Sequence, residues 1–330
     1  AVLGLEETRQ NYQAIADRQW QVVKEEYFTA TGRCAVKTQT GLVLALKYHL
    51  SDNERLTEQM LRKLLRDNRN KLNTGFVGTP LLCNVLTEHG MTDLAYRLLL
   101  NEEYPGWLHE VKLGATTVWE RWNSLDENGR ISSTGMNSLN HYSYGAVLEW
   151  IFRHVAGIDV TEQGPGGKMM RISPKVDYKL GSASAVYDSA SGCYRCGWQI
   201  ENGDQITVTV TVPFGAKAQV ILPYAPDSVY HDTDNPLFET VENGICCVKA
   251  GQYTVTYKAA SPLKKSYSVD STLEDLLAEP AIRAFLSNMM EVDMIPDLAY
   301  GLTLRQAAEA FAGGVSAEQA QRLNALLEEF

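Results

Sequence analysis

The chain has 330 residues, of which 45% are hydrophobic and 21% charged, which favours a sizeable packed core over global disorder. Its 40 Asp and Glu residues outnumber 30 Lys and Arg residues, and the net charge of −10 argues against a nucleic-acid binder, because phosphate recognition needs a basic face. No apolar run approaches the roughly 18 residues of a membrane span. Residues 1–10 do not resemble a signal peptide, and the chain does not begin with Met, so we expect it to begin inside a larger protein.

The first 160 residues predict a series of antiparallel helix hairpins. Apolar residues recur at helical spacing in segments 5–28, 40–50, 56–65, 80–89 and 93–100. Gly90 suits the end of the fourth segment, and Thr92 can cap the fifth. Residues 136–156 are apolar nearly all round and predict a buried helix. The loops at 73–80 and 104–135 exceed the usual connection of about 4–6 residues, which favours a helical toroid over a simple bundle.

The periodicity changes from helical to alternating after the linker Gln163–Gly167. Ile206, Val208, Val210 and Val212 alternate with threonines, which is typical of a half-buried strand. Asn-Gly pairs at 202–203 and 243–244 predict hairpin turns. Residues 170–260 are therefore predicted to form an antiparallel β-sandwich.

A small helical tail is predicted over residues 268–330. Capping boxes at Ser271–Glu274, Thr303–Gln306 and Ser316–Gln319 each open a short apolar-periodic segment. Residues 271–330 hold three arginines and ten acids, so this tail carries −7 of the total charge.

Six cysteines are too few for a disulfide scaffold. Cys193 and Cys196 form a CxxC pair, but the second CxxC of a four-thiolate zinc site is missing. We interpret both as ordinary buried or half-buried thiols, and expect no metal or cofactor.

Two polar and aromatic spans are candidates for chemistry. In Trp119-Glu120-Arg121-Trp122, aromatic faces can stack on sugar C–H groups while a carboxylate acts as a base. The alternative is a buried aromatic cluster with a Glu120–Arg121 ion pair. His141 lies in the second span, where it is either a hydrogen-bonded core residue or part of a site. The glycines of span 73–80 match no phosphate-binding motif.

Four motifs in order resemble the C-terminal half of bacterial α-L-rhamnosidases of glycoside hydrolase family 78. They are Thr-Gly-Phe-Val-Gly-Thr-Pro at 74–80, Tyr-Pro-Gly-Trp at 104–107, Gly-Ala-Thr-Thr-Val-Trp-Glu-Arg-Trp at 114–122 and Asn-Ser-Leu-Asn-His-Tyr at 137–142. The resemblance covers about residues 1–260. It implies that residues 1–160 are the C-terminal half of an (α/α)6 toroid, followed by the β-sandwich at 170–260.

The resemblance also implies an activity, namely hydrolysis of terminal α-L-rhamnose from glycosides with inversion. Glu120 corresponds to the family's proposed general base, and His141 to a sugar-contacting residue. Trp107 and Trp122 are then expected in the pocket wall, with Arg121 orienting the surroundings of Glu120. No cofactor is implied, because carboxyl pairs suffice for glycoside hydrolysis.

One family segment has no counterpart here. The family's general acid lies in an Arg-Asp-Glu-Arg-like segment upstream of this half, and an inverting enzyme needs both carboxyl groups. We therefore expect the 330-residue chain to be inactive without the N-terminal part of the enzyme. The open toroid face predicts self-association or a rearranged compact half-barrel.

Two other functions stay open at the level of sequence. The sandwich or the acidic tail suits a non-catalytic sugar-binding or assembly module with a basic partner, and a toroid hydrolase can act on another sugar. Unpaired cysteines and the lack of an export signal predict a cytoplasmic location.

Overall fold

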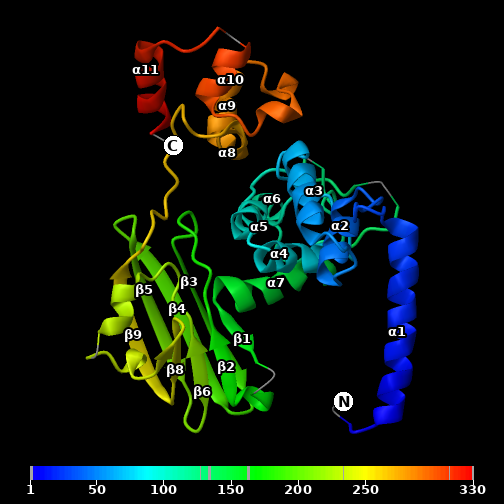
Figure 1. The fold of residues 1–330 in the computed structure, drawn as a ribbon, viewed down its shortest axis with the longest axis vertical. Coiled ribbons are helices and arrows are strands. Elements are labelled where there is room, and N and C mark those ends of the chain that lie inside the picture. The colour runs from blue at the N-terminus through cyan, green and yellow to red at the C-terminus, as the bar shows by residue number, and fades with distance from the viewer. Residues whose placement is uncertain are drawn as a thin grey trace. The chain divides into compact units, whose positions relative to one another are not determined.

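A computed structural model describes residues 3–126, 128–132, 135–161, 164–232, 234–311 and 313–328. Gln163 of the expected linker lies outside these residues. The chain divides into two compact units, Ala1–Ser261 and Pro262–Phe330 (Figure 1). No helix in the described ranges has both the length and the apolar character needed to cross a membrane.

Helical hairpins form the first part of unit 1. The helices are α1 (Glu6–Tyr27), α2 (Gln39–Lys47), α3 (Glu54–Asp67), α4 (Thr79–Glu88), α5 (Thr92–Leu99) and α6 (Trp107–Lys112). Helix α4 is central, since it packs on α2, α5 and the later helix α7, and its Leu82, Val85 and Leu86 are fully buried. The five helical segments predicted between residues 5 and 100 are thus confirmed. Thr92, however, is the first residue of α5 and not its cap, because Met91 holds the N-cap position without a side-chain hydrogen bond.

Helix α1 differs from the others because none of its residues is buried. It is held at one side by the Trp20 indole N–H, which donates to the carbonyl of His49 over 3.1 Å, and by the ion pair of Lys24 with Asp52. Its apolar residues Tyr12, Ile15 and others stay exposed. The helical spacing seen in the sequence therefore gives an apolar face that nothing in the described chain covers.

The prediction of one buried helix over 136–156 is wrong at its beginning. Helical structure starts only with a 3-10 turn at Ser143–Ala146, continues through α7 (Val147–Trp150) and ends in a π-helical turn at Ile151–Val155. Residues 137–142 form hydrogen bonds to another loop instead, and Leu148 is 56% exposed. Trp150 is fully buried, and its indole N–H donates to the Thr87 hydroxyl over 2.8 Å.

Two sheets follow the helices within unit 1 (Figure 1). The strand order is β1-β2-β6-β8-β7 in one sheet and β3-β4-β5-β9 in the other. The strands are β1 (Ile158–Val160), β2 (Met169–Ile172), β3 (Ser182–Ser189), β4 (Gly192–Glu201), β5 (Gln205–Val212), β6 (Lys217–Val220), β7 (Val241–Glu242), β8 (Ile245–Val248) and β9 (Gly251–Lys258). All pairs are antiparallel except β2 with β6, which is parallel.

The alternating pattern of β5 buries Ile206, Val208 and Val210 on one face, as predicted. Asn202 and Asn243 have positive φ in the two Asn-Gly turns, which confirms both hairpins. Cys196 is buried on β4 and Cys193 is half-buried, as expected for ordinary thiols.

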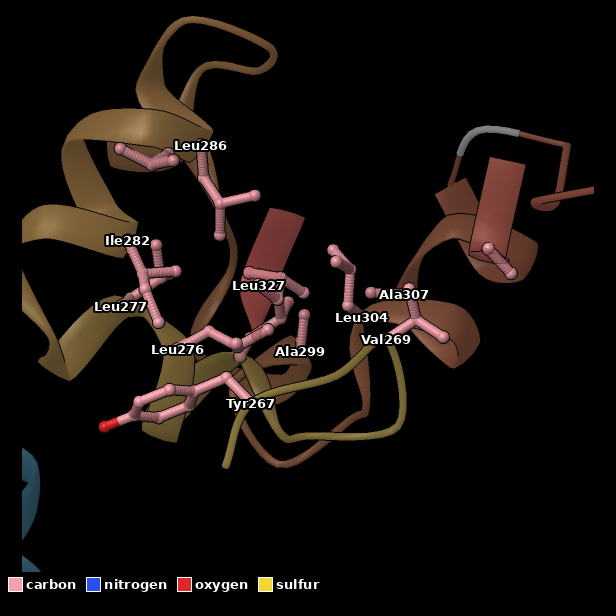
Figure 2. Close-up of a cluster of buried hydrophobic side chains, with 13 residues drawn as sticks. Tyr267, Val269, Leu276, Leu277, Ile282, Leu286, Ala299, Leu304, Ala307 and Leu327 are labelled. Carbon is pink, nitrogen blue, oxygen red and sulfur yellow. The ribbon is translucent and has the colours of Figure 1, made fainter. Parts of the chain in front are cut away.

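Unit 2 is a helical module with its own hydrophobic core. Its helices are α8 (Leu273–Ala278), α9 (Pro280–Ser287), α10 (Leu304–Phe311) and α11 (Ala317–Leu327). Figure 2 shows side chains from all four helices pointing toward one another, including Leu276, Ile282, Leu304 and Leu327. An antiparallel bridge joins Thr272 and Thr303, the residues that precede α8 and α10.

Two of the three predicted capping boxes are present in unit 2. The reciprocal hydrogen bonds form at Thr303–Gln306 and at Ser316–Gln319. At α8 the cap lies one residue later than predicted, because the Thr272 hydroxyl, rather than that of Ser271, accepts from the backbone of Asp275.

Candidate active site

Two loops that carry separate sequence motifs run side by side in the helical part of unit 1. The backbone N–H of Glu120 donates to the carbonyl of Ser138 over 2.9 Å, and that of His141 donates to the carbonyl of Val118 over 2.8 Å. The Thr117 hydroxyl also donates to the carbonyl of Leu139. This antiparallel pairing places Glu120 and His141 on neighbouring loop segments, although they are 21 positions apart in the sequence.

A buried serine locks the turn that follows Glu120. Ser124 is fully buried, and its hydroxyl accepts from the backbone N–H of Arg121 over 3.1 Å. The same hydroxyl donates to the side-chain oxygen of Asn137 over 2.6 Å, while the Asn137 amide donates back to the carbonyl of Ser124 over 2.9 Å. The hydrogen bonds between Ser124 and Asn137 therefore form a second connection between the two motif loops.

Aromatic rings from the motif loops, the start of α6 and the 3-10 turn at Ser143–Ala146 gather around the paired segments. Trp122 stacks on Tyr144 with ring centroids 3.9 Å apart and planes 5° apart, and Trp107 meets the Trp122 ring edge-on at 5.3 Å. Phe76 stacks on His141 at 4.9 Å. The motif at 74–80 thus contributes an aromatic surface to the site.

The indole nitrogens fix the two tryptophans of this cluster. The Trp107 N–H donates to the carbonyl of Tyr144 over 3.0 Å, and the Trp122 N–H donates to the carbonyl of Thr74 over 3.2 Å. Of the residues predicted for the pocket wall, Trp107 is half-buried, whereas Trp122 is 8% exposed and has one face against Tyr144.

The polar residues predicted for the site are accessible. Glu120, Arg121 and His141 are all half-buried. A carboxylate in such a position can accept a proton from a water molecule while aromatic rings contact the apolar faces of a sugar. Among the described residues, no group of three or more His, Cys, Asp or Glu side chains is arranged to hold a metal ion.

Glu110 is a buried carboxyl group of this site that the sequence analysis did not single out. It lies on α6 and is 4% exposed, and its Oε1 atom is buried without a hydrogen-bond partner among the described residues. Burial raises its pKa to about 8. Phe76 and Tyr144 were also missed as site residues. Phe76 was visible inside a motif, but neither the pairing of the loops nor the burial of Glu110 has a local sequence signal.

Two domain models of one protein family match this chain. Residues 1–155 match the model of the bacterial α-L-rhamnosidase 6-hairpin glycosidase domain, and residues 157–235 match that of the bacterial α-L-rhamnosidase C-terminal domain. This chain is a C-terminal portion of a protein of the bacterial α-L-rhamnosidase family. The first match spans the helical part of unit 1, and the second spans strands β1 to β6 of its β part.

Curated relatives agree with this assignment. An α-L-rhamnosidase of Formosa agariphila is 36% identical over 245 residues, covering 73% of this chain and 26% of the relative. One from Alteromonas sp. (strain LOR) is 39% identical over 221 residues, covering 66% of this chain and 23% of the relative. The chain therefore spans about a quarter of the length of these α-L-rhamnosidases.

Solved structures show the same fold. The Streptomyces avermitilis α-L-rhamnosidase, determined with L-rhamnose, superimposes with a TM-score of 0.68 at 32% identity, over 76% of this chain and 24% of that one. The Aspergillus terreus enzyme gives a TM-score of 0.68 at 28% identity, over 79% of this chain and 28% of that one. The architecture is thus a partial helical toroid followed by a β-sandwich, with the helical unit 2 appended.

Proposed function

We propose that this chain supplies the general-base side of the active site of an inverting α-L-rhamnosidase. The observation that carries the proposal is the pairing of residues 117–120 with 138–141, which gathers Glu120, His141 and the aromatic rings. In this mechanism Glu120 deprotonates the water that attacks the anomeric carbon, and His141 binds the sugar. Arg121 and Trp107 orient and enclose the reacting groups.

The proposed reaction needs a second carboxyl group outside this chain. An inverting hydrolase places its general acid about 6.5–9.5 Å from the base, so that water fits between them and the leaving oxygen is protonated from the other face. Glu110 is too buried to reach a glycosidic oxygen. We therefore propose that the acid lies in the part of the enzyme that precedes the region matched here. The proposed substrates are rhamnose-containing glycosides.

Glu120→Gln tests the base in a longer enzyme that includes the preceding part of the catalytic domain. We expect kcat on p-nitrophenyl α-L-rhamnoside to fall about 10²- to 10⁴-fold, because the amide cannot accept the proton of water. Glu149→Gln, an exposed carboxylate paired with Arg153, is the matched control and should retain wild-type kcat.

Rescue of activity by azide distinguishes a variant that lacks the base from one that does not fold. It is an anionic nucleophile that needs no deprotonation, so it should restore turnover in Glu120→Ala and give a rhamnosyl azide of inverted configuration. Near-normal hydrolysis by Glu120→Gln would contradict the assigned role, and an azide product of retained configuration would contradict inversion.

The 330-residue chain alone should hydrolyse p-nitrophenyl α-L-rhamnoside at background rate, because its general acid is missing. The measurement is a fixed-time assay of the purified chain beside the longer enzyme. Turnover that Glu120→Gln abolishes in the isolated chain would show that an acid within these residues had been overlooked.

A further inference from the structure

The two nitrogens of the His141 imidazole have different surroundings. Nδ1 accepts a hydrogen bond from the backbone N–H of Ser143 over 3.3 Å. A backbone N–H can only donate, so in the neutral ring the lone pair is on Nδ1 and the proton is on Nε2. Within the described ranges, no protein group forms a hydrogen bond with Nε2. The neutral ring therefore offers an N–H donor to a ligand.

The backbone on both sides of this hydrogen bond is held in place. The N–H of His141 donates to the carbonyl of Val118 over 2.8 Å, which fixes the residue that carries the ring. The N–H of Gly145 donates to the carbonyl of Tyr142 over 3.0 Å and closes the turn that contains Ser143, which is 4% exposed. The donor and the acceptor therefore belong to ordered segments.

Two aromatic rings stack against the imidazole. Phe76 lies with its ring centroid 4.9 Å from that of His141, and Tyr142 lies at 5.2 Å, each with its plane 15° from the imidazole plane. Turning the imidazole about χ2 would lose both stacked contacts. It would also move Nδ1 away from the Ser143 N–H, so the stacking and the hydrogen bond favour the same ring orientation.

Phe76 joins His141 to the buried part of the aromatic cluster. Its ring is 46% exposed, yet it meets the ring of Tyr144, which is 5% exposed, at 5.7 Å. Its loop is closed by the hydroxyl groups of Thr74 and Thr79, which are buried and 2.7 Å apart. A side chain so exposed adds less to a core than a buried one. Its contact with His141 gives it another use.

We propose that Phe76 is a positioning residue, which holds the His141 ring with Nε2–H available as a hydrogen-bond donor to a sugar oxygen. A sugar hydroxyl can accept such a bond. This inference rests on the proposed role of His141 in binding the sugar. Because that contact binds the ground state and the transition state alike, its loss is expected to raise KM rather than to lower kcat.

Amide hydrogen exchange resolved at Ser143 in the 330-residue chain tests the contact independently of activity. Phe76→Leu keeps an apolar side chain but removes the ring, so the Ser143 N–H should exchange about three- to tenfold faster. Phe76→Tyr keeps the ring and should keep the wild-type rate. His141→Phe, which has no acceptor, gives the rate of the broken bond. The matched control is Phe214→Leu, the same change at a side chain that is 95% exposed between β5 and β6.

Long-range ¹H–¹⁵N spectra of the same chain test the tautomer. In mildly basic solution, where imidazole rings are uncharged, His141 should show a protonated Nε2 and an unprotonated Nδ1. The signals that disappear in His141→Phe identify this ring among the six histidines of the chain. A protonated Nδ1 would contradict the proposed donor.

A double-mutant cycle in the longer enzyme tests whether Phe76 acts through His141. Phe76→Leu should raise KM for p-nitrophenyl α-L-rhamnoside about three- to tenfold with kcat nearly unchanged, and Phe76→Tyr should restore KM. In a His141→Ala background, Phe76→Leu should change KM by less than about twofold, because the group it positions is absent. Phe214→Leu should leave both constants unchanged.

The outcomes separate this inference from the proposed function. An unchanged Ser143 exchange rate in Phe76→Leu, or additive losses in the double variant, would overturn the positioning role. If Phe76→Leu folds poorly, Phe76→Met makes the same comparison. An unchanged KM in His141→Ala would instead overturn the sugar-binding role, and retained activity in Glu120→Gln the assignment of the base. The exchange rate would still decide whether Phe76 holds the ring.

Discussion

Two carboxyl groups ten positions apart have different environments in the candidate site. Glu120 is half-buried on a loop, where a carboxylate can meet water and substrate. Glu110 is buried on α6, and burial raises its pKa to about 8. Separating the environments of neighbouring carboxyl groups lets one act as a base while the other remains neutral and structural.

The raised pKa of Glu110 predicts a specific dependence of stability on pH. The unfolded chain loses this proton near pH 4.5, whereas the folded chain keeps it up to about pH 8. The folded state therefore binds more protons in this window, and its stability falls as pH rises, by at most about 1.4 kcal/mol per pH unit. Glu110→Gln removes the titrating group, so wild type should lose stability relative to this variant between pH 4.5 and 8.

Urea unfolding of wild type and Glu110→Gln at a series of pH values, followed by tryptophan fluorescence, measures this difference. Glu102→Gln, which changes an exposed carboxylate paired with Lys112, is the control and should follow wild type throughout. A constant difference between wild type and Glu110→Gln across the series would mean that Glu110 titrates normally in the folded chain.

At the scale of elements, local patterns predicted most of the fold. The helices from α1 to α5, the strand β5 and both Asn-Gly turns follow from periodicity and turn chemistry. The prediction of a helix failed over 136–142 because this segment is a loop whose backbone hydrogen bonds go to residues 117–120, with Met136 and Tyr142 exposed. That pairing is a tertiary contact, and it also brings the two motifs together. Periodicity alone could therefore predict neither the loop nor the candidate site.

The site itself was only partly predictable. Glu120 and His141 were named from motifs, and they remain predictions whose proximity rests on the paired loops. Glu110 was not named, because its helix reads locally as half polar and only the folded chain buries it. Residues that act through burial need the tertiary structure to be recognised.

The hydrogen bonds of Ser124, which join the two motif loops, give a prediction at the scale of elements. Ser124→Ala removes the hydroxyl that bonds the Arg121 backbone and the Asn137 side chain, and leaves both groups without that partner. We expect unit 1 to lose about 1–3 kcal/mol of unfolding free energy. Ser138→Ala, which removes a hydroxyl bonded to the Asn140 carbonyl at the surface, should stay within about 0.5 kcal/mol.

Thermal and urea unfolding of the two serine variants provides the comparison. Equal stability of Ser124→Ala and Ser138→Ala would show that the buried hydroxyl does not hold the loops together. Because Ser124 and Ser138 lie in unit 1, the unfolding of unit 2 should be unchanged in both variants.

At the scale of the molecule, the charge and the site belong to different units. The candidate site lies in unit 1, while residues 271–330, within unit 2, carry −7 of the net charge of −10. The overall acidity therefore says little about the substrate. Helix α1, in the helical part of unit 1, has an exposed apolar face and no buried residue.

That exposed face predicts self-association of the isolated chain. Tyr12, Ile15 and Val22 are 68%, 43% and 52% exposed on one side of α1, and exposed apolar patches promote association. In sedimentation velocity, the sedimentation coefficient of the wild-type chain should increase with protein concentration. The double variant Ile15→Lys, Val22→Lys should sediment as a monomer over the same concentration series.

The matched control adds the same charge to the opposite side of the helix. Gln10 and Gln21 lie there, away from the apolar residues, and form only exposed hydrogen bonds within α1. Gln10→Lys with Gln21→Lys should associate as wild type does, because the apolar face is intact. Equal loss of association in both double variants would assign the effect to net charge. A wild-type chain that is monomeric at every concentration would contradict the predicted self-association.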